Sequence, residues 1–142
     1  MTDATFEKVH RSDTPMYGPR KLLLCGFPAP VQPKFSVVLE MAGLADIAVL
    51  WANPEHASKT LAELLELPAG AGAGADSALV RAIIVSGITE NQLHTLMAVC
   101  RKTGMKPALW AALTPTSETW PLAQLLEELQ AERKALSKRK RR

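Results

Sequence analysis

The residues best suited to chemistry form a hydroxyl-rich segment that follows an apolar run and precedes a leucine-rich stretch. It holds Thr114, Thr116, Ser117 and Thr119, and it ends at Trp120. Hydroxyls and backbone amides at a strand-to-helix junction can hold an anion such as phosphate or carboxylate. The structural alternative is that Thr119 caps the following helix while Trp120 packs the helix start against the core.

A second polar turn, Ser86-Gly87-Ile88-Thr89-Glu90, would adjoin this segment if the strands before the two turns are neighbours. The candidate ligand-binding residues are Ser86, Gly87, Thr89, Thr114, Thr116, Thr119 and Trp120. The motif Gly-x-Ser-x-Gly is absent from the sequence, which argues against a serine hydrolase. We therefore assign no catalytic residue, and we leave open whether the protein is an enzyme while favouring that it is not.

Histidine and cysteine offer little further chemistry. His56 follows Glu55 in an expected loop and could act as a base or ligand, although a surface histidine is the simpler interpretation. Cys25 and Cys100 lie in apolar segments without metal-ligand spacing, so we expect buried thiols. Gly-x-Gly-x-x-Gly is absent after the first apolar run, and the Gly/Ala-rich stretch from Gly70 to Gly74 follows a predicted helix, which favours a linker. No metal and no cofactor is expected.

The charge of the chain is concentrated at its end. The net charge is +3, but residues 133–142 carry seven positive charges, so the rest of the chain has a net charge of −4. The last five residues could bind nucleic acid non-specifically through its phosphates, or serve only as a solubilising end. These residues are Lys138, Arg139, Lys140, Arg141 and Arg142.

Composition points to a folded protein outside the membrane. The chain has 142 residues, 47% hydrophobic and 22% charged, which suits a globular domain with its own core. No apolar run approaches the ~20 residues that a membrane helix needs. The polar N-terminus lacks the apolar centre of a secretory signal, so we expect a cytoplasmic protein.

Four short apolar runs predict strands that alternate with four amphipathic helices. The runs are Leu22–Cys25, Ile47–Trp51, Ala82–Ser86 and Ala108–Leu113. Continuous apolar runs are typical of strands buried on both faces of a parallel sheet. The predicted organisation is a flexible arm (1–20), a β-α-β-α unit (21–68), a Gly/Ala-rich linker (69–80), a second β-α-β-α unit (81–132) and a basic tail (133–142).

The two units align with each other when the chain is shifted by 61 positions. Nine of 46 positions between residues 22 and 67 are then identical, including two glycines and a proline at corresponding turns. We predict an internal duplication that forms a mostly parallel four-stranded sheet flanked by helices. The alternative is that two unrelated units converged on common turn residues. The halves could share one sheet, pack as separate units or pair with a second chain.

The second half carries motifs that resemble a known family. They are Ile84-Val85-Ser86-Gly87 with Thr89-Glu90, Leu113-Thr114-Pro115-Thr116, Trp120, and the leucine-glutamate stretch from Leu122 to Leu129. In these motifs the segment from about Ala82 to Glu132 resembles the bacterial domain-of-unknown-function family 3783. The first half departs from the pattern, with Asn53, Glu55 and Lys59 at the positions of Thr114, Thr116 and Trp120. The resemblance implies a fold but no reaction.

Three functions remain open at this point. We favour a non-catalytic module that binds a protein partner or a small anionic ligand. The alternatives are a nucleic-acid-associated protein that uses the basic tail, and an anion-binding protein or enzyme with its site at the Thr114–Trp120 loop. No membrane partner is expected, and a homodimer is compatible with the sequence.

Overall fold

A computed structural model describes residues 14–140 of the chain. Its four strands form one mixed sheet in the order β2-β1-β3-β4. The strands are β1 (Lys21–Cys25), β2 (Ala48–Ala52), β3 (Ala82–Ser86) and β4 (Leu109–Ala112). Each predicted apolar run therefore forms a strand, and the two halves of the chain share one sheet.

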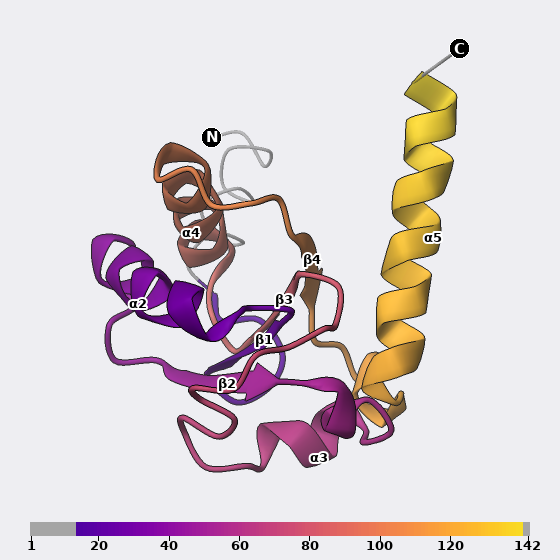
Figure 1. The fold of residues 1–142 in the computed structure, drawn as a ribbon, viewed down its shortest axis with the longest axis horizontal. Helices are drawn as coiled ribbons and strands as arrows, with labels where there is room; N and C mark the ends of the chain where they lie inside the picture. Colours follow the sequence, from indigo (N-terminus) through magenta and orange to yellow (C-terminus); the bar gives the residue numbers. More distant parts are fainter. Residues whose placement is uncertain (1–13, 141–142) are drawn as a thin grey trace, which may run out of the picture.

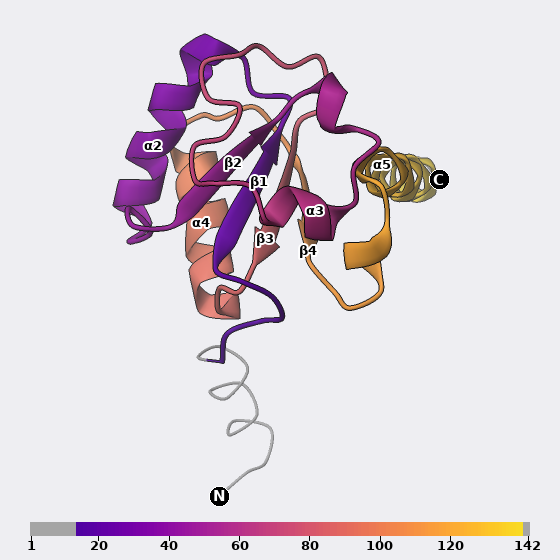
Figure 2. The same ribbon diagram turned by 90° about the horizontal axis from the view of Figure 1, so that it is seen from below.

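The helices alternate with the strands and cover both faces of the sheet. They are α2 (Gln32–Met41), α3 (Leu61–Leu65), α4 (Glu90–Lys102) and α5 (Leu122–Lys140), with short 3-10 helices η1 (Ala29–Val31), η2 (Pro54–His56) and η3 (Ser117–Thr119). The helices α2 and α4 lie on one face, and α3 and the start of α5 lie on the other (Figures 1 and 2). The architecture is thus a three-layer α/β fold.

The prediction of a mostly parallel sheet is wrong, because the central pair of strands, β1 and β3, is antiparallel. The outer pairs, β1 with β2 and β3 with β4, are parallel. The reason lies in the segment that follows α3. The ammonium of Lys21, at the start of β1, donates to the carbonyls of Leu65 and Leu67, so α3 ends near the start of β1. The chain then runs along β2 again, where the amide of Gly70 donates to the carbonyl of Val49. It thus reaches the end of the sheet where β1 and β2 end, and β3 begins there.

Burial on both faces explains the apolar sequence of the strands. Alternate residues of a strand point to opposite faces, so every second side chain of β1 and β3 enters a different core. Leu22, Leu24, Ile83 and Val85 pack with α2 and α4, whereas Leu23, Cys25, Ala82 and Ile84 pack with α3 and α5. The central strands consequently have no polar face.

The strand registers of the two halves correspond at a spacing of 61 residues. Lys21 pairs with Ala48 in the first half, and Ala82 pairs with Leu109 in the second. In the antiparallel central pair, the middle residue Leu23 lies opposite Ile84, which is itself 61 positions later. A half turn about an axis through this pair therefore exchanges equivalent residues of the two halves.

The same correspondence extends to the turns. An isolated bridge joins Thr60 to Pro121, again 61 positions apart. Residues 79–81 cross closely over Gly26, and residues 18–20 cross in the same way over Gly87. Segments outside the strands therefore follow the same half-turn relation.

Two segments lie against the body where the sequence predicts an arm and a linker. In the arm, the amide of Met16 donates to the carbonyl of Ile88 at 2.8 Å. The Gly/Ala-rich segment follows the outer edge of β2 and reaches the side chain of Gln32, whose amide oxygen accepts from the amide of Gly74 at 2.7 Å. Residues 1–13 of the predicted arm lie outside the described part of the chain.

No helix within residues 14–140 is long and apolar enough to cross a membrane.

Candidate functional site

The residues predicted to bind an anion lie together at one end of β3 and β4. Because these two strands are parallel neighbours, the turn after β3 and the loop after β4 leave the sheet at the same end of the strands. Ser86, Gly87 and Thr89 belong to the turn, and residues 114–120 form the loop. The expected proximity of the two strands is therefore found.

The hydroxyls of these loops mostly bond to their own backbone. Thr89 Oγ1 accepts from the amide of Gln92 at 3.0 Å, and the Gln92 side chain accepts from the amide of Thr89 at 3.0 Å. Thr114 Oγ1 accepts from the amide of Ser117 at 2.9 Å. These contacts are capping and turn interactions, which stabilise the local backbone and leave these hydroxyls less available to a ligand.

Thr119 and Trp120 also have structural contacts. Thr119 Oγ1 donates to the carbonyl of Thr116 at 2.9 Å within η3, so it does not reach the start of α5. The carbonyl of Trp120 accepts from the amide of Leu61 at 3.1 Å and ties the loop to α3. The Thr116 side chain is exposed.

Residues 15–20, here called the strap, cover this end of β3. The amide of Gly87 donates to the carbonyl of Tyr17 at 3.2 Å, and Tyr17 OH donates to Glu118 Oε1 at 2.8 Å. The hydrogen bond to Glu118 raises the pKa of the Tyr17 phenol. A Cβ on Gly18 would lie 2.3 Å from Ser86 Oγ, a buried hydroxyl without a hydrogen-bond partner among the described residues. The chain itself thus occupies the space above Ser86.

The other residues considered in the sequence analysis lie away from these two loops. His56 Nδ1 accepts from the amide of Asn53 at 3.1 Å and so caps η2. Cys25 and Cys100 are buried free thiols, and burial raises the pKa of Cys25 to about 12. Within residues 14–140 no group of three His, Cys, Asp or Glu side chains could hold a metal.

The basic tail is only partly described. Backbone positions up to Lys140 belong to α5, but the side chains of Lys138, Arg139 and Lys140 lie outside the described part of the chain. Arg141 and Arg142 lie outside it entirely.

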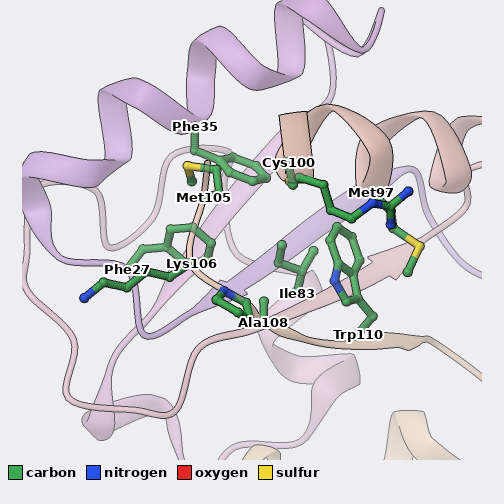
Figure 3. A pocket seen from close by; sticks show the side chains of 11 residues that line it. Phe27, Phe35, Ile83, Met97, Cys100, Met105, Lys106, Ala108 and Trp110 are labelled. Carbon is green, nitrogen blue, oxygen red and sulfur yellow. The ribbon is translucent and has the colours of Figure 1, made fainter. Parts of the chain in front are cut away.

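A cavity of about 280 Å³ lies elsewhere, between α4, β4 and the rings of two phenylalanines. The Phe27 and Phe35 rings are at one end of this pocket, and Trp110 and Met97 are at the other (Figure 3). The lining residues are Phe27, Phe35, Ile83, Met97, Cys100, Arg101, Met105, Lys106, Pro107, Ala108 and Trp110. We call this cavity the α4–β4 pocket.

The α4–β4 pocket joins a buried aromatic wall to a cationic rim. Phe27 and Phe35 are buried and meet edge to face at 5.2 Å between ring centroids. Arg101 and Lys106 are exposed, and no lining residue is acidic. Burial raises the pKa of the Cys100 thiol, while the adjacent Arg101 acts against that rise. The pocket can therefore hold an apolar body and place a negative charge at its rim.

Sequence reasoning missed this pocket, although the internal repeat contained a signal for it. Ala108 occupies the position of Ile47 in the first half, and Lys106 occupies that of Ala45. A change from Ile to Ala directly before the strand, beside a new cation, predicts a space next to a charge. This comparison requires the two halves to be aligned residue by residue.

Comparison with known proteins gives a match for the second half only. Neither a curated protein nor a solved structure matches the chain. The matched segment contains β3, α4, β4 and most of α5, and so it includes the pocket residues from Ile83 to Trp110. Residues 81–136 match the family model DUF3783, a domain of unknown function, as the motifs of the second half predict.

Proposed function

We propose that the protein is a non-catalytic module that binds a small ligand with an apolar body and an anionic group. The observation that carries the proposal is the α4–β4 pocket, with its aromatic wall and its two cations at the rim. Ligand pockets are mostly apolar and contain a few polar groups that fix orientation. A volume of about 280 Å³ suits a ligand about the size of a fused pair of aromatic rings.

Charge at the rim supports an anion over a neutral ligand. Arg101 approaches from α4, and Lys106 approaches from the loop before β4, beside Phe27 (Figure 3), so each cation can contact an anionic group on a bound molecule. An exposed ion pair contributes modestly to affinity, whereas the apolar wall supplies most of it. The pocket should therefore prefer an anionic ligand to its neutral analogue without depending entirely on the charge.

Naphthalene sulfonate and its neutral counterpart, naphthalene sulfonamide, test the proposal. We expect the sulfonate to shift amide NMR signals of α4 and β4 and to bind more tightly than the sulfonamide. Ala108→Ile, which introduces the first-half residue, should fill the pocket and weaken both ligands at least about tenfold. Arg101→Ala should weaken only the sulfonate.

A matched control is available on the same helix. Lys102 is exposed, adjacent to Arg101 and absent from the pocket lining, so Lys102→Ala should leave sulfonate affinity unchanged. If Ala108→Ile folds and binds the sulfonate as tightly as the wild type, the ligand lies elsewhere and the proposal is wrong. Equal losses in Lys102→Ala and Arg101→Ala would reduce the interaction to general electrostatic attraction.

We also infer that the two halves arose by duplication of one β-α-β-α unit. The matching strand registers and the crossings over Gly26 and Gly87 support this origin. On this inference the pocket is a later specialisation of the second half. A separately expressed second half that pairs with a copy of itself through β3 would support a symmetric ancestor, whereas one that unfolds would not.

A further inference from the structure

The outer edges of the sheet differ in how their hydrogen-bonding groups are satisfied. Along β2, the carbonyl of Val49 accepts from the amide of Gly70 and the amide of Trp51 donates to the carbonyl of Ala71, both at 2.8 Å. The fit is close, because a Cβ on Gly72 would lie 2.0 Å from the carbonyl oxygen of Trp51. The Gly/Ala-rich segment thus closes this edge.

The corresponding groups of β4 belong to Trp110 and Ala112. The amides of Leu109 and Leu113 both donate toward β3, at 2.9 Å, so the residues between them at alternate positions face outward. Within residues 14–140 no hydrogen bond reaches the carbonyl of Trp110 or the amide of Ala112. In this half the chain continues as α5 instead of returning along the strand.

Two features that protect edge strands, charged side chains and proline, are missing from β4, although the strand is short at 4 residues. Its sequence, Leu-Trp-Ala-Ala, contains no charge and no proline. Natural edge strands carry such residues because unpaired backbone groups invite pairing with another chain. The outward backbone groups of β4 are therefore available to hydrogen-bond with a further strand.

The helix α5 indicates which molecule would supply the strand that pairs with β4. Its first part packs on the sheet, while its C-terminal part extends past the body of the protein (Figure 1). Leu129 is half-buried against the core, whereas Leu136, two turns further along the same face, is 57% exposed. The extension therefore leaves the apolar side chain of Leu136 away from the sheet.

Charge along α5 is divided into an acidic and a basic part. Residues 122–132 contain three glutamates and no cation, and residues 133–140 contain five cations and no acid. Two such helices repel when they lie parallel and in register, and they attract when they lie antiparallel. The charge pattern thus complements a second copy of itself.

We propose that the protein forms a two-fold dimer in which β4 pairs antiparallel with β4 of a second copy. A two-fold axis perpendicular to the sheet places both α5 helices on the same face and makes them antiparallel. Acidic and basic parts then lie opposite each other beside a continuous eight-stranded sheet. The arrangement repeats between chains the antiparallel contact that β1 and β3 make within one chain.

Sedimentation equilibrium of the full-length chain tests the dimer. We expect twice the 15.4 kDa mass of one chain at about 0.1 mM. Ala112→Pro removes only the outward amide, because that amide does not bond to β3, and it should weaken dimerisation at least about tenfold. Ala112→Ser keeps the amide and should dimerise like the wild type.

Charge exchange on α5 provides a second measurement that leaves the strand intact. The variants Glu127→Lys/Glu128→Lys and Arg133→Glu/Lys134→Glu alter exposed residues, and each should lose dimer when alone. Mixing the two variants should restore it as a heterodimer. This measurement decides the matter if Ala112→Pro fails to fold.

Three results would overturn the proposal. The first is a wild-type chain that stays monomeric at about 0.5 mM, which would leave the β4 edge for a strand of a different protein. The second is a folded Ala112→Pro variant that dimerises like the wild type. The third is a mixture of the two charge variants that remains monomeric.

Discussion

The two halves of the protein share a framework and differ in how each is completed. The first half ends its second helix at Leu65, and the following segment covers the edge of β2. The second half continues α5 to Lys140 and leaves β4 uncovered. The two units thus keep the same strand registers. The segments that follow them differ, and that difference leaves one outer edge of the sheet covered and the other open.

A second difference lies beside the helices α2 and α4. In the first half Leu44 and Ile47 are buried in the core, whereas their counterparts Met105 and Ala108 are only half-buried beside the α4–β4 pocket. Glu40 is likewise replaced by Arg101. The region beside α2 is therefore packed and carries an acidic side chain, whereas the equivalent region beside α4 contains the pocket and carries a basic one.

The first test of this comparison is to truncate equivalent core leucines in the two halves. Leu64 on α3 and Leu125 on α5 are 61 positions apart and only 1% and 7% exposed. Each mutation to Ala should lower the free energy of unfolding by about 2–5 kcal/mol, measured by chemical denaturation. Leu136→Ala, on the exposed extension, should change the stability of the monomer by less than about 0.5 kcal/mol.

An unequal result would be informative. If Leu64→Ala costs the expected amount and Leu125→Ala costs under about 1 kcal/mol, the two helices are not equivalent in packing. The shared framework would then be limited to the strands.

The second comparison concerns the glycines that end the first strand of each half. Gly26 and Gly87 have φ of 75° and 71°, and a Cβ would lie 2.4 Å from the carbonyl oxygen of Leu79 or 2.6 Å from that of Gly18. A mutation to Ala should cost about 1–2 kcal/mol for the backbone conformation and about 1–3 kcal/mol for the clash. Denaturation of the two variants should give similar losses.

Two other glycines separate these contributions. Gly43 and Gly104 have φ of 78° and 76° with open space where a Cβ would point. Their mutation to Ala should cost only the backbone contribution, about 1–2 kcal/mol. Equal losses at all four positions would mean that the crossings over Gly26 and Gly87 give way easily.

Much of this framework could be predicted from the sequence because it depends on local chemistry. Apolar runs located the strands, glycines marked their ends, and Thr89 with Gln92 identified the start of α4. The antiparallel centre could not be predicted, since it depends on the path of the Gly/Ala-rich segment, which follows β2 and brings β3 to the end of β1. Non-local packing also determines the pocket, the closed edge of β2 and the contact of the strap with Ser86.

The smallest expected effect concerns the capping side chains at the starts of α3 and α4. Glu63 Oε1 accepts from the amide of Thr60 at 2.9 Å, and Gln92 makes the same contact with the amide of Thr89 at 3.0 Å. The backbone hydrogen bond from Thr60 is the main cause that lowers the pKa of the Glu63 carboxyl from its ordinary 4.5. Only the first of these caps can therefore respond to acid.

A lowered folded-state pKa fixes the sign of the response. The cap at Glu63 stabilises the protein fully above the carboxyl's ordinary pKa, and this contribution is lost as the pH falls through the lowered value. Glu63→Gln should therefore make the melting temperature less sensitive to acid between pH 7 and about pH 3, while Gln92→Glu should make it more sensitive. Because Glu63 is exposed, both changes should be small beside those of the leucine and glycine variants. Identical acid profiles for the wild type and both variants would mean that neither cap distinguishes the halves, and that their differences lie only at the α4–β4 pocket and the sheet edges.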